Sequence, residues 1–404
     1  MSPQLVAAQG LSVQGFRSMG VATGVKKGRP DLALIVSDVP DTVAAAVFTQ
    51  NAFAAAPVHL GRQHVADGNL QAIVVNAGNA NACTGRQGLR DALQMAQETA
   101  DALGIQKEQV LVCSTGIIGH KLPMDKVVPG IHGCAARLDE GHGTEAAHAI
   151  LTTDSGPKEA RRTFQANGIT YTLAGIAKGA GMIHPNMATM LGFVVTDAPI
   201  ARGGVQRALQ TAVDVSFNQI SVDGDESTND TCALLANGAA GGPELHPGVE
   251  GWDAFQAALT DLCQDLAKRI PADGEGATKL LTCHVTGAQD DATARQLARG
   301  VVRSTLVKAA LHGSDPNWGR IVAALGQVDR SMPTDVDIAV ASASGHQPVL
   351  IGGEPVEELT AAHTILQAPE VAFHIRVGDR AGQGTAWGCD ITEDYVTFNA
   401  EYST

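Results

Sequence analysis

The chain has 404 residues, with 28 Lys and Arg against 42 Asp and Glu, and its formal net charge is −14. This charge argues against nucleic acid as a partner, which needs a basic stripe, and against an anionic membrane surface. The length predicts two or three packing units, and 44% hydrophobic residues are enough to fill large cores.

Runs rich in Val and Ile and bounded by Gly, Pro or Asp predict strands. In chain order these runs are 32–37, 45–49, 71–77, 110–114, 171–177, 190–198, 336–342 and 371–377. Apolar residues at helical spacing predict helices over 90–104, 204–217, 252–270 and 292–312. Because strands and helices do not alternate strictly, we expect an α+β arrangement with helices layered over sheets.

The cysteines and the N-terminus bear on the compartment. The seven cysteines are scattered singly without a CxxC pair, which argues against a zinc site and favours a reducing compartment. The first residues do not read as a signal peptide, and no apolar run is long enough to span a membrane. We therefore expect a cytoplasmic protein with no metal and no membrane partner.

Two polar stretches suggest ligand loops but fail the detailed patterns. "VVNAGNANACTG" (74–85) follows a strand but lacks both glycine signatures of nucleotide sites, so we expect a packed loop whose Asn side chains bond backbone groups. "VDGDESTND" (222–230) begins like a calcium loop, but Thr228 and Leu234 occupy positions that need Gly and Glu. A polar turn bordering a site is the better interpretation. Two turn-rich stretches are expected to be loops: 237–248 and 313–320.

"CSTGIIGH" (113–120) ends a strand with a hydroxyl residue beside a glycine. Such a pair can present a side-chain hydroxyl and a backbone N–H to one point, as an oxyanion hole requires. Taken alone, a common turn is the better interpretation. In the same way, Lys178 alone is more often a solvated charge.

"KGAGMIHPNMATML" (178–191) combines a broken turn with a small residue, Ala188, and a hydroxyl residue, Thr189. These are the ingredients of self-cleavage, in which the Thr189 hydroxyl attacks the Ala188 carbonyl and water opens the resulting ester. The freed α-amine, with a pKa of about 7.7–8, can serve as the base for its own hydroxyl. The alternative is a buried threonine that bonds its own backbone.

These motifs occur together with the opening "GFRSMGVATGVKKGRPDLALIVSD" and the ending "YVTFNAEYST". Their order and spacing over essentially the whole chain resemble the glutamate/ornithine N-acetyltransferase family of arginine biosynthesis. The resemblance implies a four-layer α/β/β/α sandwich, similar to N-terminal-nucleophile hydrolases with different connectivity, and a smaller C-terminal α/β region. It also implies cleavage between Ala188 and Thr189 into an α chain (1–188) and a β chain (189–404), assembled as an α2β2 heterotetramer.

The resemblance further implies ping-pong transfer of acetyl from N-acetylornithine to glutamate through an acetyl-enzyme on Thr189. The Thr115 hydroxyl and the Gly116 N–H would stabilise the oxyanion. No cofactor is implied, although some members of the family also accept acetyl-CoA as a donor. The implied substrate-binding residues are Thr153, Lys178, Thr189, Glu275, Asn399 and Thr404.

Charge agrees with this assignment in kind, because an α-carboxylate needs a cation such as Lys178 and an ornithine ammonium needs an anion such as Glu275. Two other functions stay open from the residues. The first is an amidase or aminopeptidase of the same architecture, with water as the acceptor. The second is a ligand-binding protein without catalysis.

Overall fold

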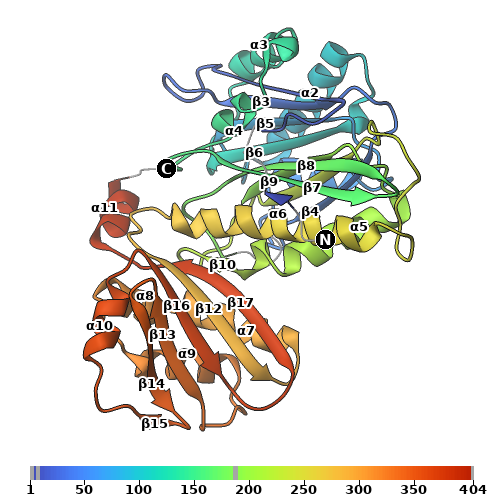
Figure 1. Ribbon diagram of the computed structural model, residues 1–404. Helices are drawn as coiled ribbons and strands as arrows, with labels where there is room; N and C mark the ends of the chain where they lie inside the picture. The colour runs from blue at the N-terminus through green and yellow to red at the C-terminus, as the bar shows by residue number, and fades with distance from the viewer. Residues whose placement is uncertain (1–3, 6–9, 185–189, 402–404) are drawn as a thin grey trace.

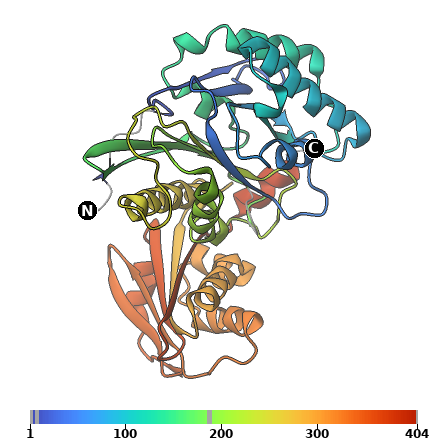
Figure 2. The same ribbon diagram turned by 90° about the vertical axis from the view of Figure 1, so that its right-hand side faces the viewer.

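The computed structural model describes residues 4–5, 10–184 and 190–401, which form two packing units (Figure 1). The first unit contains a six-stranded and a four-stranded sheet, and the second contains a seven-stranded sheet. Seen from the side, the two units lie end to end, and the helix α11 (Glu393–Glu401) lies at their junction (Figure 2).

The first unit is built from the following elements. Its six-stranded sheet has the order β1-β7-β8-β9-β11-β4, with β1 (Gln4–Leu5), β7 (Lys158–Ala166), β8 (Ile169–Lys178), β9 (Leu191–Thr196), β11 (Thr231–Ala236) and β4 (Val43–Phe48). Its four-stranded sheet has the order β2-β3-β5-β6, with β2 (Phe16–Val21), β3 (Leu32–Ser37), β5 (Ala72–Asn79) and β6 (Val110–Ile117). Its helices are α1 (Ala56–His64), α2 (Gly85–Leu103), α3 (Met124–Ala135), α4 (Glu145–Ala149), α5 (Arg202–Asp214) and α6 (Trp252–Ala272).

The two sheets of the first unit pack face to face. Ile35 and Val75 from one sheet meet Phe193 and Leu235 from the other in the space between them. Successive side chains of a strand point to opposite faces, so Val194 instead joins the core under α5 and α6. Helices α2 and α3 cover the outer face of the four-stranded sheet. The predicted four-layer α/β/β/α arrangement is therefore confirmed.

The six-stranded sheet draws its strands from both sides of the predicted cleavage point. Strands β9 and β11 pair in parallel with each other. On one side β9 pairs with β8, and on the other β11 pairs with β4. Because β8 and β4 precede residue 188 and β9 and β11 follow it, the ranges 1–188 and 189–404 are not separate packing units.

The second unit is the predicted C-terminal α/β region. Its sheet has the order β10-β17-β12-β16-β13-β14-β15, with β10 (Ile220–Ser221), β17 (Gly382–Cys389), β12 (Leu280–Ala288), β16 (Glu370–Arg376), β13 (Asp337–Ser342), β14 (Gly345–Ile351) and β15 (Glu354–Pro355). Four helices pack on this sheet around one apolar core: α7 (Asp291–Arg303), α8 (Thr305–His312), α9 (Trp318–Val328) and α10 (Thr360–Leu366).

Every strand and helix predicted from the sequence corresponds to an observed element, but several boundaries were wrong. Helix α2 begins at Gly85 and not at 90, and α5 ends at Asp214 and not at 217. The single helix expected over 292–312 is two helices, because Ser304 has ψ 117° and its side chain caps α8. The loop expected over 313–320 ends early, since Asn317 caps α9, which begins at Trp318. The loop expected over 237–248 is confirmed.

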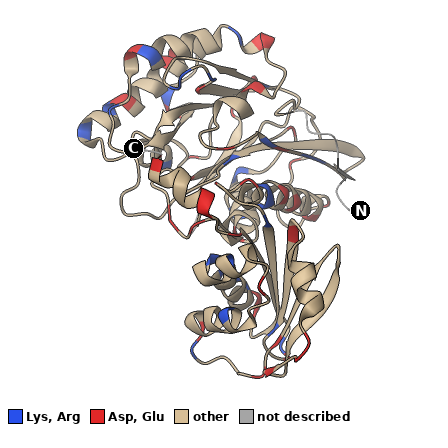
Figure 3. Cartoon of the chain, turned by 90° about the vertical axis from the view of Figure 1, so that its left-hand side faces the viewer, with Lys and Arg blue, Asp and Glu red and all other residues tan. Residues whose placement is uncertain are grey.

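Three further observations concern the surface charge, the cysteines and the apolar character of the helices. In the side view, basic positions are interspersed with acidic ones over both units (Figure 3). All seven cysteines are unpaired. Within the described ranges, no helix combines the length and apolar character that crossing a bilayer would require.

Candidate active site

One pocket of about 340 Å³ collects residues from distant parts of the chain. The predicted site residues on its wall are Thr115, Gly116, Thr153, Lys178, Glu275 and Asn399. Ala188, Thr189 and Thr404, which the sequence also indicated, lie outside the described residues. Met190 lines the pocket, so the chain directly after Thr189 lies at this wall.

The Thr115–Gly116 pair lies at the end of β6, where that strand crowds against β5. Gly116 has φ 132°, and a Cβ there would lie 2.3 Å from the carbonyl carbon of Gly78. A residue with a side chain would therefore be strained and would push the strands apart. The glycine allows this close approach of the two strands, and Thr115 and Gly116 both line the pocket at the strand end.

Two asparagines, one within β5 and one in the loop before β11, hold this strand end in place. Asn76 donates to the Asn79 carbonyl at 2.8 Å and accepts from the Ser114 hydroxyl at 2.6 Å. Asn229, from the loop before β11, donates to the carbonyls of Ala80 and Ser114 at 2.6 and 2.9 Å. The loop expected for 74–85 was wrong in extent, because β5 runs to Asn79 and α2 begins at Gly85. The expectation that its Asn side chains bond backbone groups is confirmed.

Lys178 ends β8 and is buried, so the interpretation as a solvated charge was wrong. Its Nζ donates to Thr152 Oγ1 at 2.7 Å and lies 3.4 Å from Thr115 Oγ1 and 3.9 Å from Asp154 Oδ2. Burial lowers the pKa of Lys178, and the opposite charge of Asp154 counteracts that effect. The side chain thus brings a cation to the pocket wall beside the Thr115 hydroxyl.

Asp154 is a residue of the site that the sequence reasoning missed. Its side chain is fully buried, accepts from Lys158 Nζ at 2.8 Å and accepts from the Gly179 N–H at 2.6 Å. Burial by itself would raise its pKa, but the charges of Lys178 and Lys158 hold the pKa of Asp154 below its usual range. Its only sequence signal is the spacing to Lys158, four residues on, which is common on any polar segment.

Glu275 and Asn399 bring an acid to the same pocket. Asn399 Nδ2 donates to Glu275 Oε2 at 2.9 Å, and the Glu275 N–H donates to the Ala180 carbonyl at 2.9 Å. A Cβ at Gly181 would lie 2.3 Å from Glu275 Oε2, so this glycine makes room for the carboxylate. The pocket wall therefore carries a lysine, Lys178, and the acidic side chain of Glu275.

The polar turn expected at 222–230 borders the pocket, as predicted. Asp223 accepts from the N–H groups of Met182 and Ile183 at 2.6 and 2.9 Å, which ties this turn to the segment after β8. Burial raises the pKa of Asp230, another residue of the wall, well above its usual range. Among the residues that the structure describes, no group of three or more His, Cys, Asp or Glu side chains could hold a metal ion.

The fold and the site thus define a protein with a four-layer α/β/β/α core and a small pocket whose wall carries both a lysine and carboxyl side chains. The model of the ArgJ family matches residues 17–404. The chain is 48% identical over 395 residues to the arginine biosynthesis bifunctional protein ArgJ of Symbiobacterium thermophilum, covering 96% of this chain and 97% of that protein. It is 46% identical over 398 residues to the protein of the same name from Bacillus licheniformis, covering 97% and 96%. The chain belongs to the ArgJ family, as its motifs predicted, and is an acyltransferase of arginine biosynthesis.

Two solved structures are also similar in part. A chain of arginine biosynthesis bifunctional protein ArgJ from Bacillus halodurans is 42% identical, with a TM-score of 0.49, covering 52% of this chain and 98% of that chain. A chain of the ornithine acetyltransferase complexed with ornithine from Mycobacterium tuberculosis is 41% identical, with a TM-score of 0.42, covering 46% and 100%.

Proposed function

We propose that this protein transfers acetyl from N-acetylornithine to glutamate through an acetyl-enzyme on Thr189. The observation that carries the proposal is the pocket that gathers Thr115, Gly116, Lys178 and Glu275, together with membership of the ArgJ family. Met190 on the same wall supports Thr189 as the nucleophile, because the two residues are adjacent in the chain.

Cleavage between Ala188 and Thr189 prepares the nucleophile. The Thr189 hydroxyl attacks the Ala188 carbonyl, and water then opens the ester to leave a carboxylate on Ala188 and a free amine on Thr189. The two products are the α chain (1–188) and the β chain (189–404). Assembly as α2β2 and a cytoplasmic location belong to the same proposal, and seven unpaired cysteines fit a reducing compartment.

Acetyl transfer then runs in two half-reactions. The Thr189 hydroxyl attacks the acetyl carbonyl while its α-amine accepts the proton, and the proton passes to the departing amine of ornithine. The amine of glutamate next attacks the acetyl ester and releases Thr189. In both steps the Thr115 hydroxyl and the Gly116 N–H stabilise the oxyanion, and losing one such donor typically costs about 10²–10³ in rate.

The charged side chains orient the two amino acids. Lys178 meets an α-carboxylate, and Glu275, held by Asn399, meets the side-chain ammonium of ornithine. Thr153 and Thr404 complete the proposed contacts. The reaction needs no cofactor, and acetyl-CoA is a proposed second acetyl donor at the same site.

Denaturing mass spectrometry of the freshly purified protein tests the cleavage. Two chains are expected, and the second begins at Thr189. A single intact chain, in a preparation that nevertheless transfers acetyl, would remove the N-terminal amine from the mechanism. The Thr189→Ala variant is the control, because it is expected to remain one chain without transfer activity.

Isotope exchange tests the reaction itself. Labelled ornithine is expected to enter N-acetylornithine in the absence of glutamate, as a ping-pong mechanism requires. Exchange that needs glutamate would contradict the acetyl-enzyme. Release of acetate faster than formation of N-acetylglutamate would identify an amidase instead.

A further inference from the structure

We infer that Asp390 is a positioning residue, which holds Glu275 and Asn399 in their places at the pocket. Asp390 lies directly after β17 and before α11, the helix that carries Asn399. The inference rests on the proposed function for the roles of Glu275 and Asn399, while the contacts of Asp390 stand independently of it.

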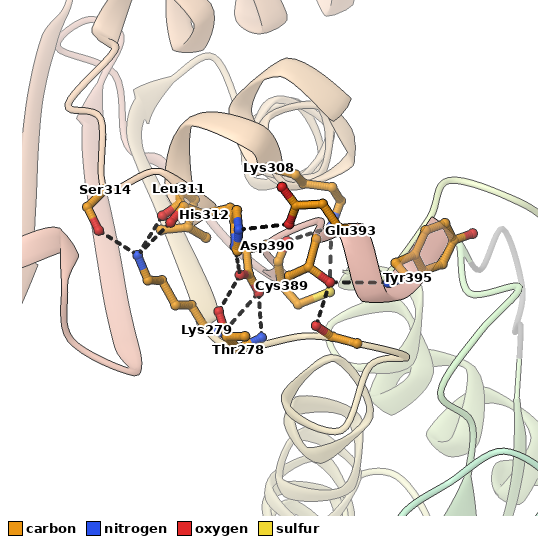
Figure 4. A network of polar contacts seen from close by, with 12 residues as sticks. Thr278, Lys279, Lys308, Leu311, His312, Ser314, Cys389, Asp390, Glu393 and Tyr395 are labelled. Carbon is orange, nitrogen blue, oxygen red and sulfur yellow. Dashed lines mark hydrogen bonds and ion pairs between the residues drawn. The ribbon is translucent and has the colours of Figure 1, made fainter. Parts of the chain in front are cut away.

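The Asp390 carboxylate binds the segment that follows Glu275 (Figure 4). One oxygen, Oδ1, accepts from the N–H groups of Thr278 and Lys279 at 2.8 and 2.9 Å. The other, Oδ2, accepts from the Thr278 hydroxyl at 2.5 Å and lies 3.0 Å from His312 Nδ1. The carboxylate has no exposed surface, so water does not replace a lost bond readily.

A second set of contacts ties the same segment to the start of α11. The Thr392 hydroxyl donates to the Gly276 carbonyl at 2.8 Å, and the Tyr395 N–H donates to Thr392 Oγ1 at 3.2 Å. A Cβ at Gly276, whose φ is 69°, would lie 2.5 Å from the Tyr395 nitrogen. Residues 275–279 and 390–395 are thus in close contact along their length, and the Asn399–Glu275 bond closes the loop between them.

The far side of Asp390 is anchored to the second unit. The His312 ring reaches both Asp390 and Glu393, the latter at 3.4 Å. Lys279 Nζ donates to the Leu311 carbonyl and to Ser314 Oγ, both at 2.7 Å. These contacts give the motif "GSDPNWGR" a role, because its first residues complete the turn to which Lys279 is fixed (Figure 4).

Replacing Asp390 by asparagine is a specific way to loosen this contact. The carboxylate accepts three bonds from N–H and hydroxyl donors. An amide offers one acceptor oxygen, so if that oxygen keeps the N–H groups of Thr278 and Lys279, the NH2 group faces the Thr278 hydroxyl and the His312 ring, and the two contacts that Oδ2 accepts are lost. Hydrogen bonds from Thr278, Lys279 and His312 also overcome the effect of burial and lower the pKa of Asp390, so the group is charged at neutral pH.

The first test compares two acetyl donors in Asp390→Asn. N-acetylornithine carries the side-chain ammonium, and N-acetylnorvaline has the same chain length without it. The ratio of kcat/KM for these donors is expected to fall at least about tenfold in the variant, because a displaced Glu275 loses its charged partner. A role in stability alone would lower both values together and leave the ratio unchanged, which would overturn the inference.

Two more variants accompany this test: one is a control, and the other probes the same contact at a second residue. Asp337→Asn is the matched control, because Asp337 also accepts from a backbone N–H, that of Gly352, at 2.7 Å, and pairs with Arg376. It lies level with Thr286, at the end of β12 opposite to Lys279, so its ratio is expected to match the wild type. Thr392→Val removes the bond to Gly276 and is expected to lower the ratio in the same direction. It decides the test if Asp390→Asn does not fold, and an unchanged ratio in Thr392→Val would then overturn the inference.

Hydrogen exchange separates this inference from the proposed function. Amides of 275–279 and 393–401 are expected to exchange faster in Asp390→Asn than in the wild type or in Asp337→Asn. If the wild type transfers no acetyl, the proposed function fails and the exchange result still decides whether Asp390 holds these segments. Unchanged exchange in both segments would overturn the inference.

Discussion

At the scale of single residues, Gly116 is where the backbone itself limits the chain. A side chain there would meet the backbone of Gly78 at 2.3 Å and would need φ 132°. Gly119, three residues on, shares a positive φ of 87° but has nothing within 4 Å of its added Cβ. Comparing alanine substitutions at Gly116 and Gly119 therefore separates the cost of the positive φ from the cost of the steric clash with β5.

We predict that Gly116→Ala lowers the free energy of unfolding by about 2–6 kcal/mol, from backbone strain of about 1–3 and overpacking of about 1–3. Gly119→Ala is expected to lose only the strain, about 1–3 kcal/mol. Urea unfolding of both variants measures the difference. If both variants lost the same free energy of unfolding, the clash with β5 would make no measurable contribution.

Lys178 is the buried cation of the pocket, so its removal should affect substrate binding directly. We predict that Lys178→Met lowers kcat/KM for N-acetylornithine by about 10–100-fold, the usual effect of losing one charge-assisted hydrogen bond. The matched control is Lys126→Met, an exposed lysine whose Nζ donates to the Gly24 carbonyl. Steady-state kinetics decide the question, and equal losses in the two variants would contradict a role in binding.

His184 is expected to make the folding stability of the protein depend on pH. Burial and the nearby charges of Arg299, Arg303 and Lys308 lower the pKa of His184 to about 3, from an ordinary value near 6.5 in the unfolded chain. As the pH falls, the imidazole of His184 therefore becomes protonated at a lower pH in the folded state than in the unfolded state. The contribution of His184 to stability is complete above about pH 6.5 and is lost progressively as the pH falls toward 3.

We predict that the wild type loses about 2 kcal/mol more stability than His184→Gln between pH 7.5 and pH 5, since each unit of pKa difference corresponds to about 1.4 kcal/mol. The measurement is the free energy of unfolding in urea at both pH values. The comparison with the variant removes the contribution of the other titrating groups. Parallel pH profiles would contradict a lowered pKa of His184.

At the scale of secondary-structure elements, Ser304 turns one apolar pattern into two helices. The periodicity of 292–312 continues through Ser304, but this residue has an extended ψ of 117° and its side chain accepts from the Val307 N–H at 3.4 Å. A short side chain that bonds a free N–H favours the start of a helix over its interior. Both α7 and α8, on either side of the break, contribute side chains to the core of the second unit.

We predict that Ser304→Ala destabilises the second unit by about 1 kcal/mol, because the capping bond is lost, whereas Ser304→Gly costs only a few tenths. Thermal unfolding of the three proteins checks the order. If Ser304→Ala were as stable as the wild type, packing and not the capping bond would determine where α7 ends and α8 begins.

At the scale of the whole molecule, the six-stranded sheet joins the two predicted chains. Strand β9 pairs with β8 and strand β11 pairs with β4, so both strands that follow the predicted cut are flanked by strands that precede it. The core between the sheets also takes side chains from both parts, such as Ile35 and Phe193. Separation of the two predicted chains would break the backbone hydrogen bonds of these strand pairs and expose this core to water.

We predict that the two chains co-elute in gel filtration and separate only in concentrations of urea that unfold the first unit. The reason is that unpaired, buried strand edges are costly. Gel filtration in a urea series, followed by denaturing electrophoresis of the peak, measures both events. Separation of folded chains at low urea would contradict the shared sheet.

Much of the fold followed from local pattern, and the failures have physical causes. The run at 32–37 coincides with β3, because a strand buried on both faces is apolar throughout. Strand β7 escaped prediction, since its alternate positions are polar or charged and it contains Arg161 and Arg162. Arg162 is buried only because Asp261 and Asp265 on α6 pair with it, and no local window shows those partners.

The sequence by itself determined the family, strands such as β3 and β9 and the residue types of the site, because motifs and hydrophobic runs are local properties of the chain. Only the tertiary structure decided that Thr115, Lys178, Glu275 and Asn399 line one pocket, that Lys178 is buried, and that Asp154 and Asp390 hold their neighbours. The physical reason is that burial and pairing depend on segments more than 100 residues apart, such as Thr278 and Asp390. Their contact exists only after the sheets and helices have packed.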